Sequence, residues 1–246
     1  MPNQIDLTGL REDDDTAIRS GSRSVTTKPG PVSLLTNRFS EALVGAADLH
    51  ADQLRKGTAI PYIAHLLGVT SIALHHGADE DEAIAALLHD AIEDAPKALG
   101  AQWVRNWIAF RFGERVLRIV EGCTDADVSP KPPWRARKET YIAHITADTE
   151  PSVILVSASD KLHNAGAILN DFRQIQMAVF DRFNLDAGVV GVIGYYRGLV
   201  DAYRATALHP QLVAELERVV SDLERETGVR GVWPLGKDGS GALSEP

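Results

Sequence analysis

Apolar residues recur at three- and four-residue spacing along most of the chain, the pattern of helices that bury one face. Together with start and stop residues, this pattern predicts an all-α domain, a helical bundle of about eight to ten helices. The expected helices cover residues 37–54, 61–76, 79 to shortly before 96, 101–111, 114–122, 134–147, 152–169, 187–205 and 210–226.

Several of these boundaries rest on local signals. Pro61 suits the first turn of a helix, where its missing N–H has no cost, and Gly77 is a natural stop. Asp79 and Glu82 have the spacing of a capping box, so a new helix is expected there. Pro96 follows its end.

Two segments are harder to interpret. The run Val-Ile-Leu-Val at 153–156 also suits a buried strand, but its helical continuation to Leu169 favours one helix across it. The stretch from Gly188 to Gly198 is unusually rich in glycine for a helix, and the sequence offers no reason for this.

The 246 residues, of which 44% are hydrophobic, suit one domain with a sizeable core. Residues 1–32 contain few large apolar side chains and are expected to form a disordered N-terminal arm. The domain is then expected at 33–228, with a C-terminal tail at 229–246.

The net charge of −9 indicates no general affinity for nucleic-acid backbones or anionic membranes. Cys123 is the only cysteine, so no intramolecular disulfide can form, and we expect this side chain to pack rather than react. Neither a signal peptide nor a membrane span is expected, and the predicted location is cytoplasmic. Five histidines are expected to have ordinary structural roles: His50, His75, His76, His144 and His209.

Three segments contribute side chains of the metal-ligand type. His65 lies in the second expected helix, His89 and Asp90 interrupt an apolar run in the third, and Asp160 precedes Asn164 by one turn. Two imidazoles and two carboxylates can hold a divalent transition metal and leave positions open for water and substrate. A charged group such as Asp90 is costly in an apolar run unless it has a partner.

An acidic pair follows this motif. Glu93 and Asp94 are expected one turn beyond His89 and Asp90, near a helix end where negative charge opposes the macrodipole. A solvated helix end is the simpler interpretation of the pair alone, but a metal ion would compensate its charge. These carboxylates could then orient the attacking water or carry its proton.

A possible phosphate contact precedes the second expected helix. Arg55 and Lys56 supply two cations, Gly57 a flexible backbone, and Thr58 a hydroxyl. The same four residues also suit an ordinary solvated loop.

The order of these motifs resembles the HD superfamily of metal-dependent phosphohydrolases. More narrowly, the chain resembles the hydrolase domain of RelA/SpoT-like proteins in its stand-alone form, the small alarmone hydrolases. The resemblance covers about residues 35–205. It rests on Arg55-Lys56-Gly57-Thr58, Pro61-Tyr62 with His65, His89-Asp90 with Glu93-Asp94, Arg137-Lys138, and Asp160-Lys161 with Asn164.

The resemblance implies an enzyme that holds a divalent ion, usually Mn²⁺, through His65, His89, Asp90 and Asp160. It implies that Glu93 and Asp94 act on the attacking water. Substrate contacts are implied for Arg55, Lys56, Thr58 and Asn164. The implied reaction removes the 3′-pyrophosphate of guanosine tetra- or pentaphosphate and gives GDP or GTP. Because no synthetase domain fits after residue 226, hydrolysis alone is expected.

Other interpretations remain open. Asp52 stands where the family often has glycine, and it adds negative charge near the expected phosphate site. The same metal chemistry could act on an adenosine alarmone, on the 2′-phosphate of NADPH or on a nucleoside monophosphate. The chain could also be an antitoxin with a toxic alarmone synthetase as its partner, or a nucleotide sensor without catalysis. The oligomeric state is not indicated.

Overall fold

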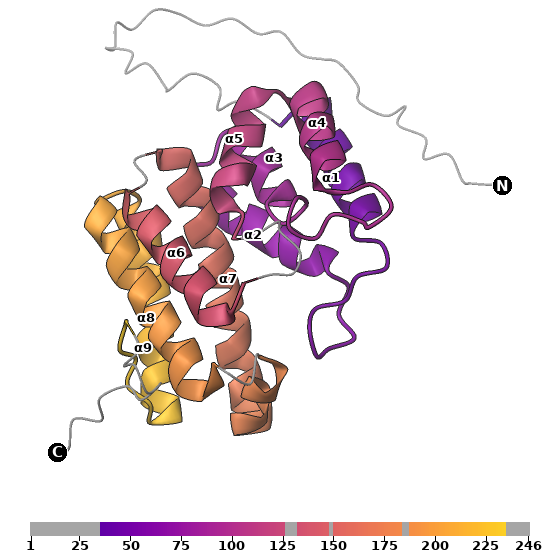
Figure 1. The fold of residues 1–246 in the computed structure, drawn as a ribbon. Helices are drawn as coiled ribbons and strands as arrows, with labels where there is room; N and C mark the ends of the chain where they lie inside the picture. Colours follow the sequence, from indigo (N-terminus) through magenta and orange to yellow (C-terminus); the bar gives the residue numbers. More distant parts are fainter. Residues whose placement is uncertain (1–34, 126–131, 148–149, 184–186, 235–246) are drawn as a thin grey trace, which may run out of the picture. The chain divides into compact units, whose positions relative to one another are not determined.

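A computed structural model describes residues 35–125, 132–147, 150–183 and 187–234, all within one compact unit that spans residues 33–246. These residues form nine α-helices and a short 3-10 helix, η1, and contain no β-strand beyond one isolated bridge (Figure 1). The elements are α1 (Asn37–Leu49), α2 (Ile63–His75), α3 (Glu80–Leu88), α4 (Ala101–Phe112), α5 (Glu114–Cys123), α6 (Trp134–Ala147), α7 (Pro151–Ile175), η1 (Gln176–Arg182), α8 (Gly188–Thr206) and α9 (Pro210–Thr227). The predicted all-α fold is confirmed.

The helices surround two hydrophobic clusters, and α7 contributes to both. The first cluster is built mainly by α1–α5, with Val156 of α7. The second is built by α6, α8, α9 and η1, together with Ile154, Leu155 and the later part of α7. Figure 1 shows α7 running between these two groups of helices. A polar residue on α7 can therefore face helices from either half.

The ambiguous apolar run at 153–156 is helical. Pro151 occupies the first turn of α7, and the side chain of Glu150 accepts a hydrogen bond from the backbone N–H of Ser152. Residues 152–160 are all buried. A helix covered on every side has no polar face, which explains why its sequence resembles a buried strand.

The first helix ends five residues earlier than predicted. It stops at Leu49, and His50 then accepts a hydrogen bond from the N–H of Gln53 in a tight turn. Leu54 pairs with Pro61 in an isolated antiparallel bridge, which requires an extended backbone. The residues from 55 to 60 thus form a loop closed at its neck.

The third helix also ends earlier than predicted. The capping box of Asp79 and Glu82 is present as expected. Regular α-helix stops at Leu88, however, because the N–H of Ala91 bonds to the carbonyl three residues back. Residues 89–94 continue as hydrogen-bonded turns, so the acidic pair does not lie on α3.

One glycine of the 188–198 stretch has a packing reason. A Cβ on Gly198 would lie 2.5 Å from Cγ of Trp233, so only glycine allows this indole to lie against α8. Trp233 belongs to the segment predicted as tail, of which residues 235–246 lie outside the described structure. The boundaries proposed for the arm, domain and tail stay predictions. None of the described helices is both long and apolar enough to cross a membrane.

Candidate metal centre and substrate cleft

The four predicted metal ligands converge on one point. Asp160 Oδ1 lies 3.2 Å from Nε2 of His65 and 3.5 Å from Nε2 of His89. Asp90 Oδ2 lies 3.0 Å from Nε2 of His89 and 3.5 Å from Nε2 of His65. The two imidazole nitrogens are 3.3 Å apart. The turn after α3 supplies two of these side chains, and α2 and α7 supply one each.

This geometry fits a divalent ion. Ligand atoms about 2.1 Å from one ion lie roughly 3.0–3.4 Å apart in octahedral or tetrahedral arrangements. The distances between donor atoms here run from 3.0 to 3.5 Å, close to that range. His65, His89 and Asp160 are buried, and their donor atoms all lie within 4.8 Å of one another. Two nitrogen and two oxygen donors are a set suited to a transition metal, so these side chains could hold a divalent ion.

Neighbouring groups orient each ligand. The Nδ1–H of His89 donates to the carbonyl of Ala86 at 2.9 Å, which leaves Nε2 facing the site. Nδ1 of His65 lies 2.9 Å from Nδ1 of His163. The amide of Asn164 donates to Asp160 Oδ1 at 2.6 Å. Such partners fix the direction of the ligand lone pairs.

The charges in this site are strongly coupled. Burial raises the pKa of Asp90 and Asp160, but the histidines, and Lys161 beside Asp160, hold both pKa values well below the ordinary range. Burial lowers the pKa of His89, yet the two carboxylates outweigh it and raise that pKa well above the ordinary value. A cation at this point is therefore favoured, and a metal ion would replace the Nε2 proton of His89.

The predicted acidic pair divides into two environments. Glu93 lines a cavity of about 280 Å³ together with Asp90. Asp94 instead accepts a hydrogen bond of 2.7 Å from the side-chain amide of Gln53. The structure thus brings both residues near the metal site, with Glu93 at the cavity.

Three cations line the same cavity. Arg137 and Lys138 of α6 each contact Asp125 Oδ2 at 2.6 Å, and Lys161 contacts Asp160 Oδ2 at 2.6 Å. Burial raises the pKa of Asp125, but the three cations lower it by more, so that this pKa lies below its ordinary value. Positive charge beside a metal site suits an anionic ligand such as a phosphate group.

The predicted phosphate loop lines a second cavity, of about 440 Å³. Arg55, Lys56, Thr58 and Asn164 all border it, and Nη2 of Arg55 donates to Oδ1 of Asn164 at 2.9 Å. The hydroxyl of Thr58 donates to the carbonyl of Arg55 at 2.9 Å and so also closes the loop.

The two cavities are neighbours, because both are lined by Asn164, Phe183 and Tyr196. The first cavity lies beside Asp90 of the candidate metal site, and the second lies at the Arg55 loop.

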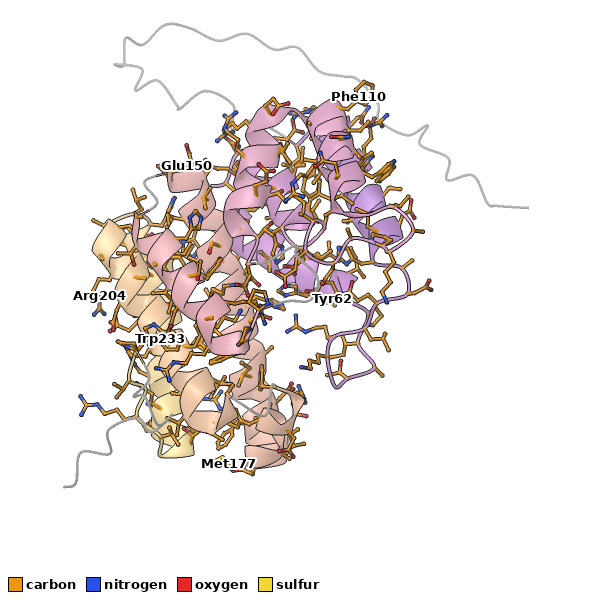
Figure 2. The ribbon with its side chains drawn as sticks, in the orientation of Figure 1. Tyr62, Phe110, Glu150, Met177, Arg204 and Trp233 are labelled. Atoms are coloured by element: carbon orange, nitrogen blue, oxygen red, sulfur yellow. The ribbon has the colours of Figure 1, made fainter. Side chains whose placement is uncertain are left out.

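Sequence reasoning missed several residues of the site. The hydroxyl of Tyr62 donates to Asp90 Oδ2 at 2.5 Å, and Figure 2 shows Tyr62 among the polar side chains near α2 and α7. His163 and Gln53 were also given no role. His50, expected to be an ordinary histidine, lies at the edge of this network. No spacing rule connects these side chains to the candidate metal ligands, because the contacts between them form only in the folded chain.

The fold and the donor set define a class of helical protein built around a buried divalent-metal site. The family model described as an HD domain matches residues 42–185. The chain belongs to this HD domain family.

Two relatives carry the name guanosine-3′,5′-bis(diphosphate) 3′-pyrophosphohydrolase. The protein from Aquifex aeolicus is 38% identical over 119 residues, which are 48% of this chain and 16% of that protein. MESH1 from Danio rerio is 34% identical over 122 residues, which are 48% of this chain and 62% of that protein. The chain spans less than two thirds of either relative. A solved structure of a metazoan ortholog of SpoT, described as hydrolysing ppGpp, has the same fold, with a TM-score of 0.58, 24% identity, and coverage of 83% of this chain and 100% of that one.

Proposed function

We propose that this chain is a metal-dependent phosphohydrolase that removes the 3′-pyrophosphate from guanosine tetra- or pentaphosphate. Mn²⁺ is the proposed metal, held by His65, His89, Asp90 and Asp160. The observation that carries the proposal is the convergence of these four side chains beside a cavity lined by Asp90, a further carboxylate and three cations.

The cleft supplies the parts that such a hydrolysis needs. A divalent ion at this site would make water acidic enough to provide a nucleophile near neutral pH. We assign to Glu93, which lines the cavity together with Asp90, the role of taking a proton from the attacking water. Asp94, one residue on, is its proposed partner in orienting that water.

The two cavities suggest how the substrate lies. The pyrophosphate group would lie near Arg137, Lys138 and Lys161, whose charge would stabilise the negative charge on its phosphoryl oxygens while water attacks the 3′ phosphorus and the bond to the ribose 3′-oxygen breaks. The nucleoside would extend into the second cavity. Its proposed contacts are Arg55, Lys56, Thr58 and Asn164.

The choice of a guanosine alarmone is supported by the names of the relatives from Aquifex aeolicus and Danio rerio. The same cleft would accept other phosphorylated nucleotides in chemical terms. Because the proposed substrates are nucleotides of the cytosol, we propose that the protein acts there. A toxic alarmone synthetase as a partner stays a proposal that co-purification would test.

A panel of nucleotides tests the substrate. Guanosine tetraphosphate, an adenosine alarmone, NADPH and a nucleoside monophosphate are each incubated with the Mn²⁺-loaded protein, and the products are separated by ion exchange. We expect guanosine tetraphosphate to give GDP and pyrophosphate at the highest kcat/KM. Preferred cleavage of another nucleotide, or release of single phosphates from the guanosine substrate, would contradict this assignment.

A further inference from the structure

A chain of three side chains runs from the acidic pair into the protein interior. The Nε2 amide of Gln53 donates to Oδ2 of Asp94 at 2.7 Å. The other end of the same amide, Oε1, lies 2.6 Å from Nδ1 of His50. His50 is buried, with 4% of its surface exposed, and Gln53 is half-buried.

The hydrogens of this chain can be assigned from chemistry alone. The carboxylate of Asp94 only accepts, so Gln53 must present its NH₂ group to it and its oxygen to His50. That oxygen only accepts as well, so His50 must carry its hydrogen on Nδ1. All the donors therefore point toward Asp94, and this single arrangement fixes both the Gln53 amide and the His50 ring.

His50 also connects this chain to the metal site. Its ring is stacked on that of Tyr62, with centroids 5.1 Å apart and planes 22° from parallel. The hydroxyl of Tyr62 holds Asp90. The backbone N–H of Tyr62 donates to the carbonyl of Gln53 at 2.9 Å, at the neck of the Arg55 loop. Gln53 and Tyr62 are thus joined by a backbone hydrogen bond. The side chain of Gln53 donates to Asp94, and that of Tyr62 donates to Asp90.

We propose that Gln53, oriented by His50, is a positioning residue that holds the Asp94 carboxylate in its working direction. This inference rests on the proposed hydrolytic function and adds to it a residue that positions one of the acidic side chains. A carboxylate that orients water must be fixed to within a fraction of an ångström, and an amide locked by a buried donor provides that restraint.

The first test compares Gln53→Ala with Gln102→Ala, a matched change at an exposed glutamine of α4 that bonds only Asn106 among the interactions described. Loss of an outer partner of a metal site commonly lowers activity about 10- to 100-fold. We expect a loss of this size in kcat for Gln53→Ala, with KM nearly unchanged, because Asp94 acts in the transition state. Gln102→Ala should match the wild type. Equal kcat for the two variants would overturn the proposal.

A double-mutant cycle separates positioning from general stability. If Gln53 acts through Asp94, then Gln53→Ala should have little further effect on kcat in an Asp94→Ala background. An undiminished loss in that background would show that Gln53 does not act through Asp94 and would overturn the proposal.

Two changes at His50 test the assigned hydrogen and also serve if Gln53→Ala does not fold. His50→Asn keeps an N–H donor near the position of Nδ1, whereas His50→Phe keeps a ring to stack on Tyr62 but has no donor. We expect His50→Asn to retain more kcat than His50→Phe. The reverse order would contradict the role of the donor.

Activity of the wild-type protein distinguishes a failure of the proposed function from a failure of the positioning role of Gln53. If the Mn²⁺-loaded wild type hydrolyses none of the nucleotides in the panel, the proposed function itself is wrong. If it hydrolyses guanosine tetraphosphate and Gln53→Ala and His50→Phe are as active as the wild type, the function stands and the positioning inference is wrong.

Discussion

Gly68, one turn after His65 on α2, allows His163 to approach the metal site. A Cβ at this position would lie 2.2 Å from Nε2 and 2.3 Å from Cδ2 of His163. Ordinary contacts begin near 3.4 Å. In Gly68→Ala the ring must therefore move by about 1 Å or more. That movement would break the 2.9 Å contact between Nδ1 of His163 and Nδ1 of His65.

Two measurable losses should follow in Gly68→Ala. Forcing a methyl group into a filled space lowers the free energy of unfolding by about 1–3 kcal/mol. Loss of the outer partner of a metal ligand weakens metal binding about 10- to 100-fold. Urea unfolding of the metal-free protein measures the first, and calorimetric titration with Mn²⁺ measures the second.

Gly166→Ala is the matched control, because Gly166 lies on α7 one turn beyond His163 and a Cβ there meets nothing within 4 Å. Replacing a helical glycine by alanine in open space should stabilise the fold by about 0.5–1 kcal/mol. Metal affinity should be unchanged. If Gly68→Ala binds Mn²⁺ as tightly as Gly166→Ala, the proposed support of His65 by His163 is refuted.

Two further predictions concern buried polar groups. Ser157 Oγ lies 2.6 Å from the hydroxyl of Tyr141 and 2.5 Å from that of Tyr203, so Ser157→Ala should lower the free energy of unfolding by about 1–3 kcal/mol in urea titrations; an unchanged midpoint would contradict this. Burial and the neighbouring His65 lower the pKa of His163 to about 4, so the unfolded state binds more protons between about pH 4 and about pH 6.5. The stability of the metal-free wild type should therefore rise with pH in this window relative to His163→Asn, and parallel pH profiles of the two proteins would argue against it.

The sequence predicted most of the helices well, because their signals are local. The capping box at Asp79 and the proline at Pro151 are each contained within one turn of chain. The first and third helices were predicted too long for a physical reason. Apolar periodicity continues past Leu49 and Leu88, but backbone bonds to carbonyls three residues back, from Gln53 to His50 and from Ala91 to Leu88, replace the α-helical pattern there.

The convergence of His65, His89, Asp90 and Asp160 could be predicted because their residue types are unusual in apolar surroundings. His89 and Asp90 interrupt a buried run, and Asp160 lies within the buried part of α7. The supporting residues could not be found in this way. His50 and Gln53 have no unusual neighbours in sequence, and their role depends on contacts with Tyr62 and Asp94, which only the fold brings close.

The measurement that tests the account most directly combines metal content with turnover. Purified wild type, His89→Ala and a matched His75→Ala control, changed at an exposed histidine of α2, are stripped with a chelator and then titrated with Mn²⁺. Bound metal per chain and hydrolysis of guanosine tetraphosphate are measured on the same samples. The account predicts that wild type and His75→Ala bind one ion per chain and recover activity together, while His89→Ala does neither. Unchanged metal content and turnover in His89→Ala would contradict the metal site on which the account rests.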